Sequence, residues 1–323
     1  MNKNLRIVFL GTPHFAVESL DILVKNDYNI VGVVTAPDSQ SGRGLDIHQS
    51  PVKEYAVAHG LKVLQPVKLK DETFIKELKS LKADLQIVVA FRMLPESVWN
   101  MPPLGTFNLH ASLLPQYRGA APINWAIING EKETGVTTFF LQHEIDTGEI
   151  LFQEKVPITE DETAGELHDT LMTTGAELVL NTVEAIDSKD YNPISQNSMG
   201  QDGQILHKAP KIFKDNCKID WNKNIHQLHD FVRGLSPYPG AWTELTSPIG
   251  NDYQFKIYRT HKEIYSSNLP LKTILTDYKT HFKVVIDGGF LHITELQASG
   301  KKQLKIEDYL RGLRMEGSWK IKE

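Results

Sequence analysis

Two polar residues near the middle of the chain have the spacing to share one face of a strand. The segment Gly105–His110 is expected to be a strand, in which side chains alternate between the two faces, so Asn108 and His110 point to the same side. In open α/β sheets, ligands bind beyond the carboxyl ends of the strands. The pattern therefore predicts an amide and an imidazole facing a site. For His110 alone, a histidine hydrogen-bonded at a sheet edge is the alternative.

A carboxylate farther along the chain is a candidate third group. Asp146 lies in the turn-forming segment His143–Gly148, between apolar runs that end at Leu141 and begin at Ile150. Local sequence does not place it near His110. If the three groups met, the amide and imidazole could donate hydrogen bonds to negative charge on a carbonyl oxygen under attack. The imidazole could also move a proton near neutral pH, with the carboxylate orienting it.

Two kinds of cofactor chemistry have little support. The turn Gly11-Thr12-Pro13 begins a helix after a strand, but it lacks the G-x-G-x-x-G pattern of a dinucleotide cradle. Two interpretations of this turn stay open: a tight turn that binds no ligand, and a turn that contacts an anion. No H-E-x-x-H or Cys/His ligand spacing is present, so no metal is predicted. A carbonyl-polarising metal held by His110 and the acids Glu144 and Asp146, with His143 close by, is the alternative.

Short apolar runs alternate with amphipathic stretches from residue 5 onward. Strands that alternate with helices predict an α/β fold with a Rossmann-like open, mostly parallel sheet, and the nearly continuous apolar runs are typical of strands covered on both faces. The expected strands are Leu5–Leu10, Ile30–Val34, Leu85–Ala90, Gly105–Leu109 and Val136–Leu141, and the expected helices are Phe15–Val24, Val52–Ala58 and Gly165–Ile186.

The last third of the chain has a different pattern. A polar stretch over 187–203 is rich in turn formers and has little periodicity, which is typical of a linker. A helix at Ile225–Gly234 is then followed by short β-type runs, with a turn at Asp287-Gly288-Gly289. These runs predict a small, OB-like β-barrel. We therefore predict a catalytic domain over 1–187, a linker over 188–204 and a second domain over 205–323.

Composition limits the functional classes. The 323 residues are 41% hydrophobic and 23% charged, as in a globular protein. The net charge of −5 argues against a general polyanion binder, so any contact with nucleic acid should be local. The single Cys217 fits a reducing compartment. Residues 1–25 show no leader pattern and no apolar run approaches the length of a membrane helix, so we expect a cytoplasmic protein without a membrane partner.

Several motifs together resemble the folate-dependent formyltransferases. They are Asn108-Leu109-His110, the run from Ser112 to Pro122, and Asp146-Thr147-Gly148. Other segments are similar to the branch of that family that acts on methionyl-tRNA, and the match spans both predicted domains. Those segments are Gly11-Thr12-Pro13, Phe15-Ala16, Pro37-Asp38, Gly42-Arg43-Gly44, Ser50–Lys53, Ile219-Asp220-Trp221 and Pro237-Tyr238-Pro239.

The resemblance implies roles for individual residues. Asn108, His110 and Asp146 would be catalytic, and the formyl donor would be a reduced folate, 10-formyltetrahydrofolate. Ser112, Leu113, Leu114 and Pro115 would line the folate site. An apolar slot for the flat pteridine could be formed by Leu113, Leu114, Val89, Phe91 and Met93. Core packing is the simpler role for each apolar residue taken alone. The segment 90–95 is one residue shorter than the version common in the branch, which leaves the shape of the pocket lip open.

The implied acceptor is methionyl initiator tRNA, bound by a monomer. Arg118 could bind a phosphate or carboxylate in bidentate fashion, with a structural salt bridge as the alternative. The long loop 38–50 carries Arg43. The segment 206–223 holds five lysines, among them Lys208 and Lys211, against two aspartates, and 301–314 is also basic. Such patches suit sequence-independent phosphate contacts, although solvated surface is the ordinary role of scattered lysines.

Three other functions stay open at this point. An amino-sugar N-formyltransferase would share the Asn, His and Asp set, and a folate hydrolase would use water as the acceptor. A non-catalytic folate- or RNA-binding module could have kept the scaffold. Binding alone does not need a proton-transfer group, which disfavours the module. The loop around Arg43 and the Ser50–Lys53 motif favour the tRNA branch over the amino-sugar enzymes.

Overall fold

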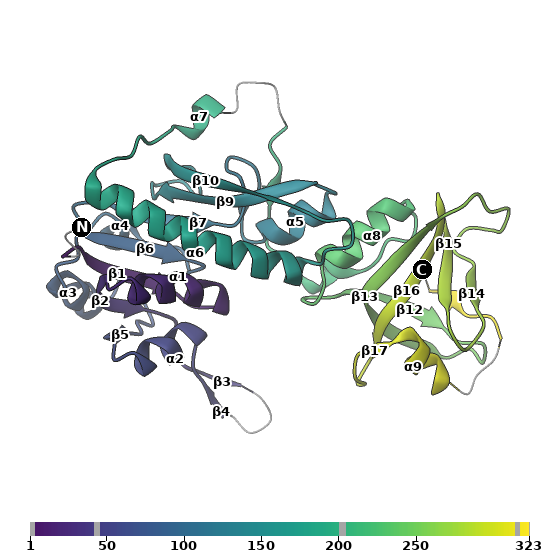
Figure 1. Cartoon of the computed structure of the whole chain (residues 1–323). Helices are drawn as coiled ribbons and strands as arrows, with labels where there is room; N and C mark the ends of the chain where they lie inside the picture. The colour runs from purple at the N-terminus through teal and green to yellow at the C-terminus, as the bar shows by residue number, and fades with distance from the viewer. Residues whose placement is uncertain (1–3, 42–45, 200–204, 314–316, 323) are drawn as a thin grey trace. The chain divides into compact units, whose positions relative to one another are not determined.

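The computed structural model describes residues 4–41, 46–199, 205–313 and 317–322, and the chain forms two compact units (Figure 1). Each unit is assembled from three segments of sequence. The first unit comprises Met1–Gly119, Thr134–Val156 and His168–Lys208, and the second comprises Ala120–Glu133, Pro157–Leu167 and Ala209–Glu323. Because these segments are not contiguous, the units do not define where the predicted domains begin and end. Those boundaries stay a prediction.

A seven-stranded sheet forms the centre of the first unit. Its order is β10 (Ile150–Pro157), β9 (Glu133–Phe140), β7 (Thr106–His110), β6 (Leu85–Val89), β1 (Arg6–Gly11), β2 (Asn29–Val34) and β5 (Val63–Leu64). The strands from β7 to β5 run parallel, and β9 is antiparallel to β7. The apolar side chains of β1 and β6 are buried on both faces, as continuous apolar runs predict. The predicted open, mostly parallel sheet is confirmed.

Helices cover both faces of this sheet. One face carries α3 (Glu72–Ser80) and α4 (Glu96–Trp99), and α3 buries Phe74 and Leu78 in a cluster with Leu10 and Val88. The remaining described elements of the first unit are α1 (His14–Lys25), β3 (Ser39–Ser41), β4 (Asp46–His48), α2 (Pro51–Ala58), β8 (Arg118–Gly119), α6 (Ala164–Ser188), α7 (Gln196–Met199) and β11 (Lys208–Ala209). Ser50 and Asp71 cap α2 and α3 by accepting hydrogen bonds from backbone N–H groups.

The opposite face is covered by α6, which lies along the sheet in Figure 1. A Cβ at Gly175 would come within 2.8 Å of Leu109 Cδ2, so helix and strand approach closely there. The hydroxyls of Thr138 and Thr182 lie 2.9 Å apart across the same contact. Leu109 therefore faces α6. Its neighbours Asn108 and His110 face the other side, which bears α4.

A curved antiparallel sheet dominates the second unit. It follows the order β14-β15-β16-β13-β12-β18 with β17 paired to β16, and it is nearly closed, which confirms the predicted small barrel-like domain. The elements are α5 (Pro122–Ile128), a 3-10 turn at Lys214–Cys217, α8 (Ile225–Gly234), β12 (Ala241–Thr246), β13 (Asp252–Ile264), β14 (Ile274–Thr276), β15 (Phe282–Ile286), β16 (Gly289–Ala298), β17 (Leu304–Lys305), α9 (Ile306–Arg311) and β18 (Lys320–Ile321). Trp221, Ile225, Phe255 and Trp319 belong to its core.

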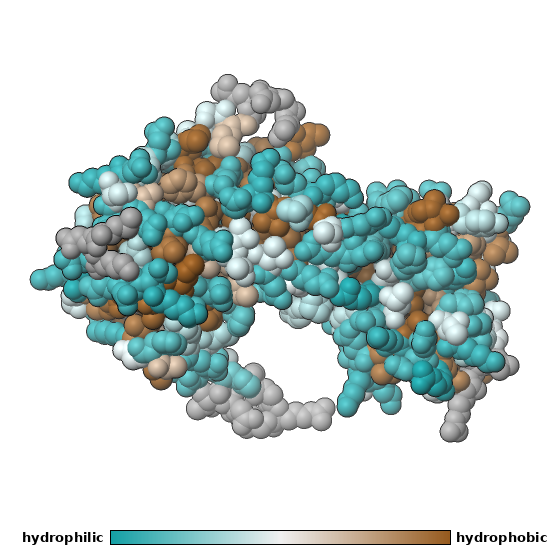
Figure 2. Space-filling view, in the orientation of Figure 1, coloured by the Kyte–Doolittle hydropathy of each residue, from teal (hydrophilic) through white to brown (hydrophobic). Residues whose placement is uncertain are grey.

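Apolar side chains are gathered inside the units. On the face shown in Figure 2, hydrophobic residues form small groups between hydrophilic ones. Among the described residues, no helix combines the length and the apolarity needed to cross a lipid bilayer.

Candidate active site

The candidate site begins at the carboxyl end of β7. Asn108 and His110 lie on the same face of this strand, with Asn108 half-buried and His110 only 7% exposed. Asn108 pairs in register with Val88 on one side and with Phe139 on the other. The sheet therefore fixes the direction of both polar side chains, as the alternation along the sequence predicted.

The imidazole of His110 has a different neighbour at each nitrogen. Nε2 lies 2.9 Å from the Tyr117 carbonyl oxygen. A carbonyl can only accept, so Nε2 carries a hydrogen and donates it. Nδ1 lies 3.9 Å from Asp146 Oδ2, which is too long for a direct hydrogen bond but short for a charge interaction. The fold thus brings together the imidazole and the carboxylate, which local sequence could not place.

The turn that carries Asp146 is held firmly. Its carboxylate accepts a hydrogen bond of 3.0 Å from the Gly119 N–H, and its backbone has a left-handed φ of 55°. At Gly148, a Cβ would overlap the Phe140 carbonyl oxygen, so only glycine lets the turn return this close to β9. The left-handed backbone at Asp146 and the close approach at Gly148 are therefore both features of the path that the chain takes through this turn.

Gln196 is the residue that sequence analysis missed. It begins α7, it is 3% exposed, and its Nε2 donates to the carbonyl oxygens of Asp146 and Gly148 at 2.9 and 2.7 Å. Its Oε1 accepts from Arg118 Nε and Nη2 at 3.0 and 2.6 Å. Arg118 therefore binds an amide within the chain. Gln196 lies in the polar stretch interpreted as a linker, where no periodicity or motif marks it.

The segment predicted to line the folate site is fastened to β9. Thr137 Oγ1 donates to the Ser112 carbonyl oxygen at 2.6 Å and accepts from the Leu114 N–H at 3.1 Å. Leu113 packs so closely over Gly135 that a Cβ there would lie 2.6 Å from Leu113 Cδ2. These contacts hold the backbone from Ser112 to Pro115 against the strand beside β7.

The predicted apolar lining divides into two groups. The side chains of Val89 and Leu114 are fully buried, so they present no surface to a ligand and could only pack behind the residues that do. Leu113, Pro115 and Phe91 keep part of their surface exposed. These three side chains therefore keep surface that a ligand could contact.

Comparisons with known proteins agree with this arrangement. Residues 5–183 match the formyl transferase family model, and residues 211–314 match the model of the formyl transferase C-terminal domain. A methionyl-tRNA formyltransferase of Bacteroides thetaiotaomicron is 56% identical over 99% of both chains, and one of Flavobacterium johnsoniae is 48% identical over 99% of both. This chain belongs to the methionyl-tRNA formyltransferase family. The resemblance seen in the sequence is confirmed.

A solved structure shares the fold of this formyltransferase at low sequence identity. It is an N-formyltransferase from Helicobacter canadensis in complex with folinic acid and dTDP-3-aminofucose. It is 21% identical, the match covers 90% of this chain and 98% of that one, and the TM-score is 0.62. The two chains therefore have the same architecture.

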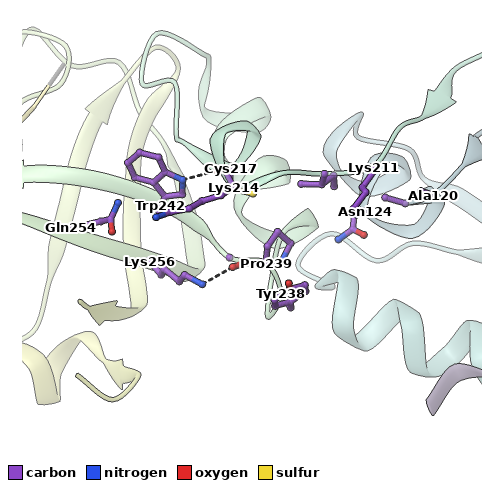
Figure 3. A pocket seen from close by; sticks show the side chains of 13 residues that line it. Ala120, Asn124, Lys211, Lys214, Cys217, Tyr238, Pro239, Trp242, Gln254 and Lys256 are labelled. Atoms are coloured by element: carbon purple, nitrogen blue, oxygen red, sulfur yellow. Dashed lines mark hydrogen bonds between the residues drawn. The ribbon is translucent and has the colours of Figure 1, made fainter. Parts of the chain in front are cut away.

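The predicted cationic residues of this formyltransferase lie in several places. Arg43 falls outside the described residues, and Lys208 is exposed on β11. Lys211 lines a cavity of about 390 Å³ in the second unit, together with Lys214 and Lys256 (Figure 3). In that cavity Trp242 Nε1 donates to the Lys214 carbonyl oxygen and Lys256 Nζ to that of Pro239. The cavity thus presents cationic and aromatic groups together.

No metal centre is evident among the residues that the structure describes, since no group of three or more His, Cys, Asp or Glu side chains there is arranged to hold an ion. The nearest acid to His143 is Glu96, at 3.7 Å between Nε2 and Oε1. Both of these side chains are largely exposed.

Proposed function

We propose that this formyltransferase moves the formyl group of 10-formyltetrahydrofolate to the α-amino group of methionyl initiator tRNA. The observation that carries the proposal is the 3.9 Å approach of Asp146 Oδ2 to His110 Nδ1 at the strand end where Asn108 points to the same side. The full-length relatives named methionyl-tRNA formyltransferase support the acceptor. The folinic acid in the Helicobacter canadensis structure supports a folate donor.

The chemistry is an acyl transfer between two nitrogens. The lone pair of the amine attacks the formyl carbon, and the carbonyl oxygen gains negative charge in a tetrahedral intermediate. In this proposal the Asn108 amide donates to that oxygen, and His110 Nδ1 donates to it once it carries the proton taken from the amine. Donors held in place before the reaction are effective because they need no rearrangement as the charge develops, and losing one typically costs about 10²–10³ in rate.

Two proton movements must balance the transfer. The amine loses a proton as its new C–N bond forms, and the folate nitrogen gains one as the old C–N bond breaks. The Nε2 hydrogen of His110 is bound to the Tyr117 carbonyl oxygen, so Nδ1 is the nitrogen that takes up and returns the proton. Asp146 lies beside Nδ1, where its charge stabilises the positive charge that builds on the ring.

The remaining assignments complete the proposal. Ser112–Pro115 and Phe91 contact the folate, with Val89 behind them, and no metal takes part. Arg43, Arg118, Lys208 and Lys211 contact tRNA phosphates, and for Arg118 the free edge of the guanidinium would do so, because Nε and Nη2 bind Gln196. The protein would act as a monomer in the cytoplasm.

A transfer assay tests the acceptor. The purified protein is incubated with labelled 10-formyltetrahydrofolate and either methionyl initiator tRNA or a set of nucleotide-linked amino sugars. Label should appear on methionine and on none of the sugars. Formylation of a sugar in place of the tRNA would overturn the assignment.

The Asp146→Asn variant tests the mechanism. Folate binding, measured by calorimetry with folinic acid, should persist while transfer collapses, because the amide carries no charge to stabilise the imidazolium. Glu144→Gln is the matched control, since Glu144 is an exposed acid of the same turn. Near-normal turnover in Asp146→Asn would remove Asp146 from the mechanism.

A further inference from the structure

A glutamine of β10 binds the segment that is predicted to line the folate site. Gln153 is half-buried, and its Nε2 donates two hydrogen bonds of 2.9 Å. One goes to the Leu114 carbonyl oxygen and the other to Thr137 Oγ1. An amide nitrogen carries two hydrogens, so both are used within the chain. Like Gln196, this residue belongs to no motif that pointed to the site.

The hydroxyl of Thr137 has all of its hydrogen-bonding positions filled. Its oxygen accepts from the Leu114 N–H at 3.1 Å and from Gln153 Nε2, and it donates to the Ser112 carbonyl oxygen at 2.6 Å. A hydroxyl has one hydrogen and two lone pairs, so these three bonds fix its orientation. Thr137 is completely buried, and removing one partner would leave buried polar groups unpaired. We call Gln153 and Thr137 the clamp.

The clamp lies on the side of the sheet that bears the candidate site. Thr137 is directly opposite His110 where β9 pairs with β7, so both side chains point to the same face. From this position the clamp binds three polar backbone groups of the chain that leaves His110. They are the Ser112 carbonyl oxygen, the Leu114 N–H and the Leu114 carbonyl oxygen. The path of this segment therefore depends on two side chains, one from β9 and one from β10.

The imidazole and the Asp146 turn are held by other contacts. The Tyr117 carbonyl oxygen binds His110 Nε2, and Gln196 binds the backbone of the Asp146 turn. Within the described part of the chain, no hydrogen bond joins Gln153 to any of these residues. Gln153 is also uncharged, so replacing it with another neutral side chain leaves the charges around His110 unchanged. The clamp and Gln196 therefore act on separate parts of the site.

We propose that Gln153 is a positioning residue that sets the affinity for the reduced folate. The inference rests on the proposed function, in which Ser112–Pro115 contact the formyl donor. Leu113 and Pro115 keep exposed surface on either side of the clamped Leu114, so they are held with it. A segment that is already in place binds a ligand more tightly than one that must first become ordered. Loss of the clamp should therefore raise the KM of the donor more than it lowers kcat.

Binding and kinetics of Gln153→Met test this inference. Methionine has a similar length but cannot donate a hydrogen bond. The Kd of folinic acid, measured by calorimetry, and the KM of the donor should both rise by about tenfold, because two hydrogen bonds to the segment are lost. The KM of methionyl-tRNA and the single-turnover rate at saturating donor should change by less than about threefold, because no group assigned to the acceptor or to proton transfer is altered. Gln153→Glu should also weaken folate binding, since a carboxylate cannot donate to the Leu114 carbonyl oxygen.

Gln65→Met is the matched control for this change. Gln65 is also half-buried, and its Nε2 also donates two hydrogen bonds, each of 2.8 Å, to the Ala36 carbonyl oxygen and Asp38 Oδ1. The control therefore removes the same amide and the same number of bonds at a place outside the clamp. It should keep the wild-type affinity for folinic acid.

The hydroxyl of Thr137 gives an independent test. Thr137→Val keeps the branched shape but loses the hydroxyl, so it should weaken folinic acid binding, whereas Thr137→Ser should retain most of the affinity. Thr138→Val is the control, because this buried hydroxyl faces α6 and lies 2.9 Å from that of Thr182. Both valine variants should lose stability, but only Thr137→Val should lose affinity.

The outcomes separate the clamp from the proposed function. Unchanged folinic acid affinity in Gln153→Met, or an equal loss in Gln65→Met, would overturn the role of Gln153. Equal affinity losses in the two valine variants would also overturn it, since they would reflect general destabilisation. If the wild-type protein neither binds folinic acid nor transfers a formyl group from any folate, the proposed function itself is contradicted.

Discussion

Replacing Gln196 with alanine should destabilise the turn that carries Asp146. The change removes no group that is assigned to substrate binding. The variant loses the two hydrogen bonds from Nε2 to the carbonyl oxygens of Asp146 and Gly148, and also the two that Oε1 accepts from Arg118. Only the first pair acts directly on the turn. Each such bond contributes about 1 kcal/mol, so the turn loses about 2 kcal/mol. A left-handed backbone at a residue such as Asp146 costs about 1–3 kcal/mol. The free energy of the two hydrogen bonds is therefore similar to the cost of the strained backbone. Without these bonds, Asp146 should leave its left-handed conformation.

The expected effect on activity follows from this balance. A loss of about 2 kcal/mol corresponds to about a 30-fold smaller equilibrium constant for formation of the held turn. Since misplacement of a catalytic group by about 1 Å can cost about 10²-fold, we expect the rate of transfer in Gln196→Ala to fall by about 10- to 100-fold. The affinity for folinic acid should change little, because the segment Ser112–Pro115 is held by Thr137 instead.

Single-turnover formylation measures the effect of the variant on the transfer rate, and thermal unfolding measures its effect on stability. Gln116→Ala is the matched control. The Gln116 side chain forms hydrogen bonds with the backbone of Ile205 and His207, in the segment that follows α7, but none with Asp146. A wild-type rate in Gln196→Ala, or an equal loss in Gln116→Ala, would refute the reasoning. Gln196→Glu should be at least as slow as Gln196→Ala, since it cannot donate to either carbonyl.

Three further changes are informative. Asn108→Ala should lower the single-turnover rate by about 10²–10³ with folinic acid affinity retained, and unchanged turnover would contradict its role as a donor. Gly148→Ala should lower the free energy of unfolding by about 1–3 kcal/mol in urea titrations and impair transfer, because its methyl group meets the Phe140 carbonyl oxygen. Desolvation lowers the pKa of buried His229 below its ordinary value of 6.5. At pH values below 6.5 the unfolded chain therefore binds a proton at this residue more readily than the folded chain does. The free energy of unfolding should fall as the pH drops below 6.5. His229→Gln should flatten this slope in urea titrations between about pH 5 and pH 8, and an unchanged slope would argue against His229 as its source.

The central sheet was predictable because its strands are buried on both faces. Nearly continuous apolar runs such as Leu85–Ala90 admit few other interpretations. The closing helix, expected at Gly165–Ile186, is observed at Ala164–Ser188, because a long apolar periodicity leaves little choice of boundary. The two-residue strand Val63–Leu64 was not expected. Such a strand is too short to show alternation, and its pairing with β2 is a tertiary contact.

The candidate site was predictable only in part. Asn108 and His110 share a face because strands alternate, which is a local rule. The approach of Asp146 depends on the return of the chain at Gly148 and on Gln196, 50 residues farther along. No local pattern marks such contacts: the turn-forming segment made Asp146 a candidate, and the family resemblance implied its catalytic role. The catalytic role of the trio stays a prediction that the variants above can test.

The pairing of the stretch after α6 has a practical consequence for dissecting the molecule. The backbones of Ile150 and Ile194 exchange two hydrogen bonds of 2.8 Å, and Gln196 follows two residues later. A truncated chain that stopped at Ser188 would contain every proposed catalytic side chain. It would nevertheless expose the edge of β10 and leave two carbonyl oxygens of the Asp146 turn without their donor. Anyone isolating the part of the chain that matches the formyl transferase family model should therefore choose a stop codon beyond Lys208.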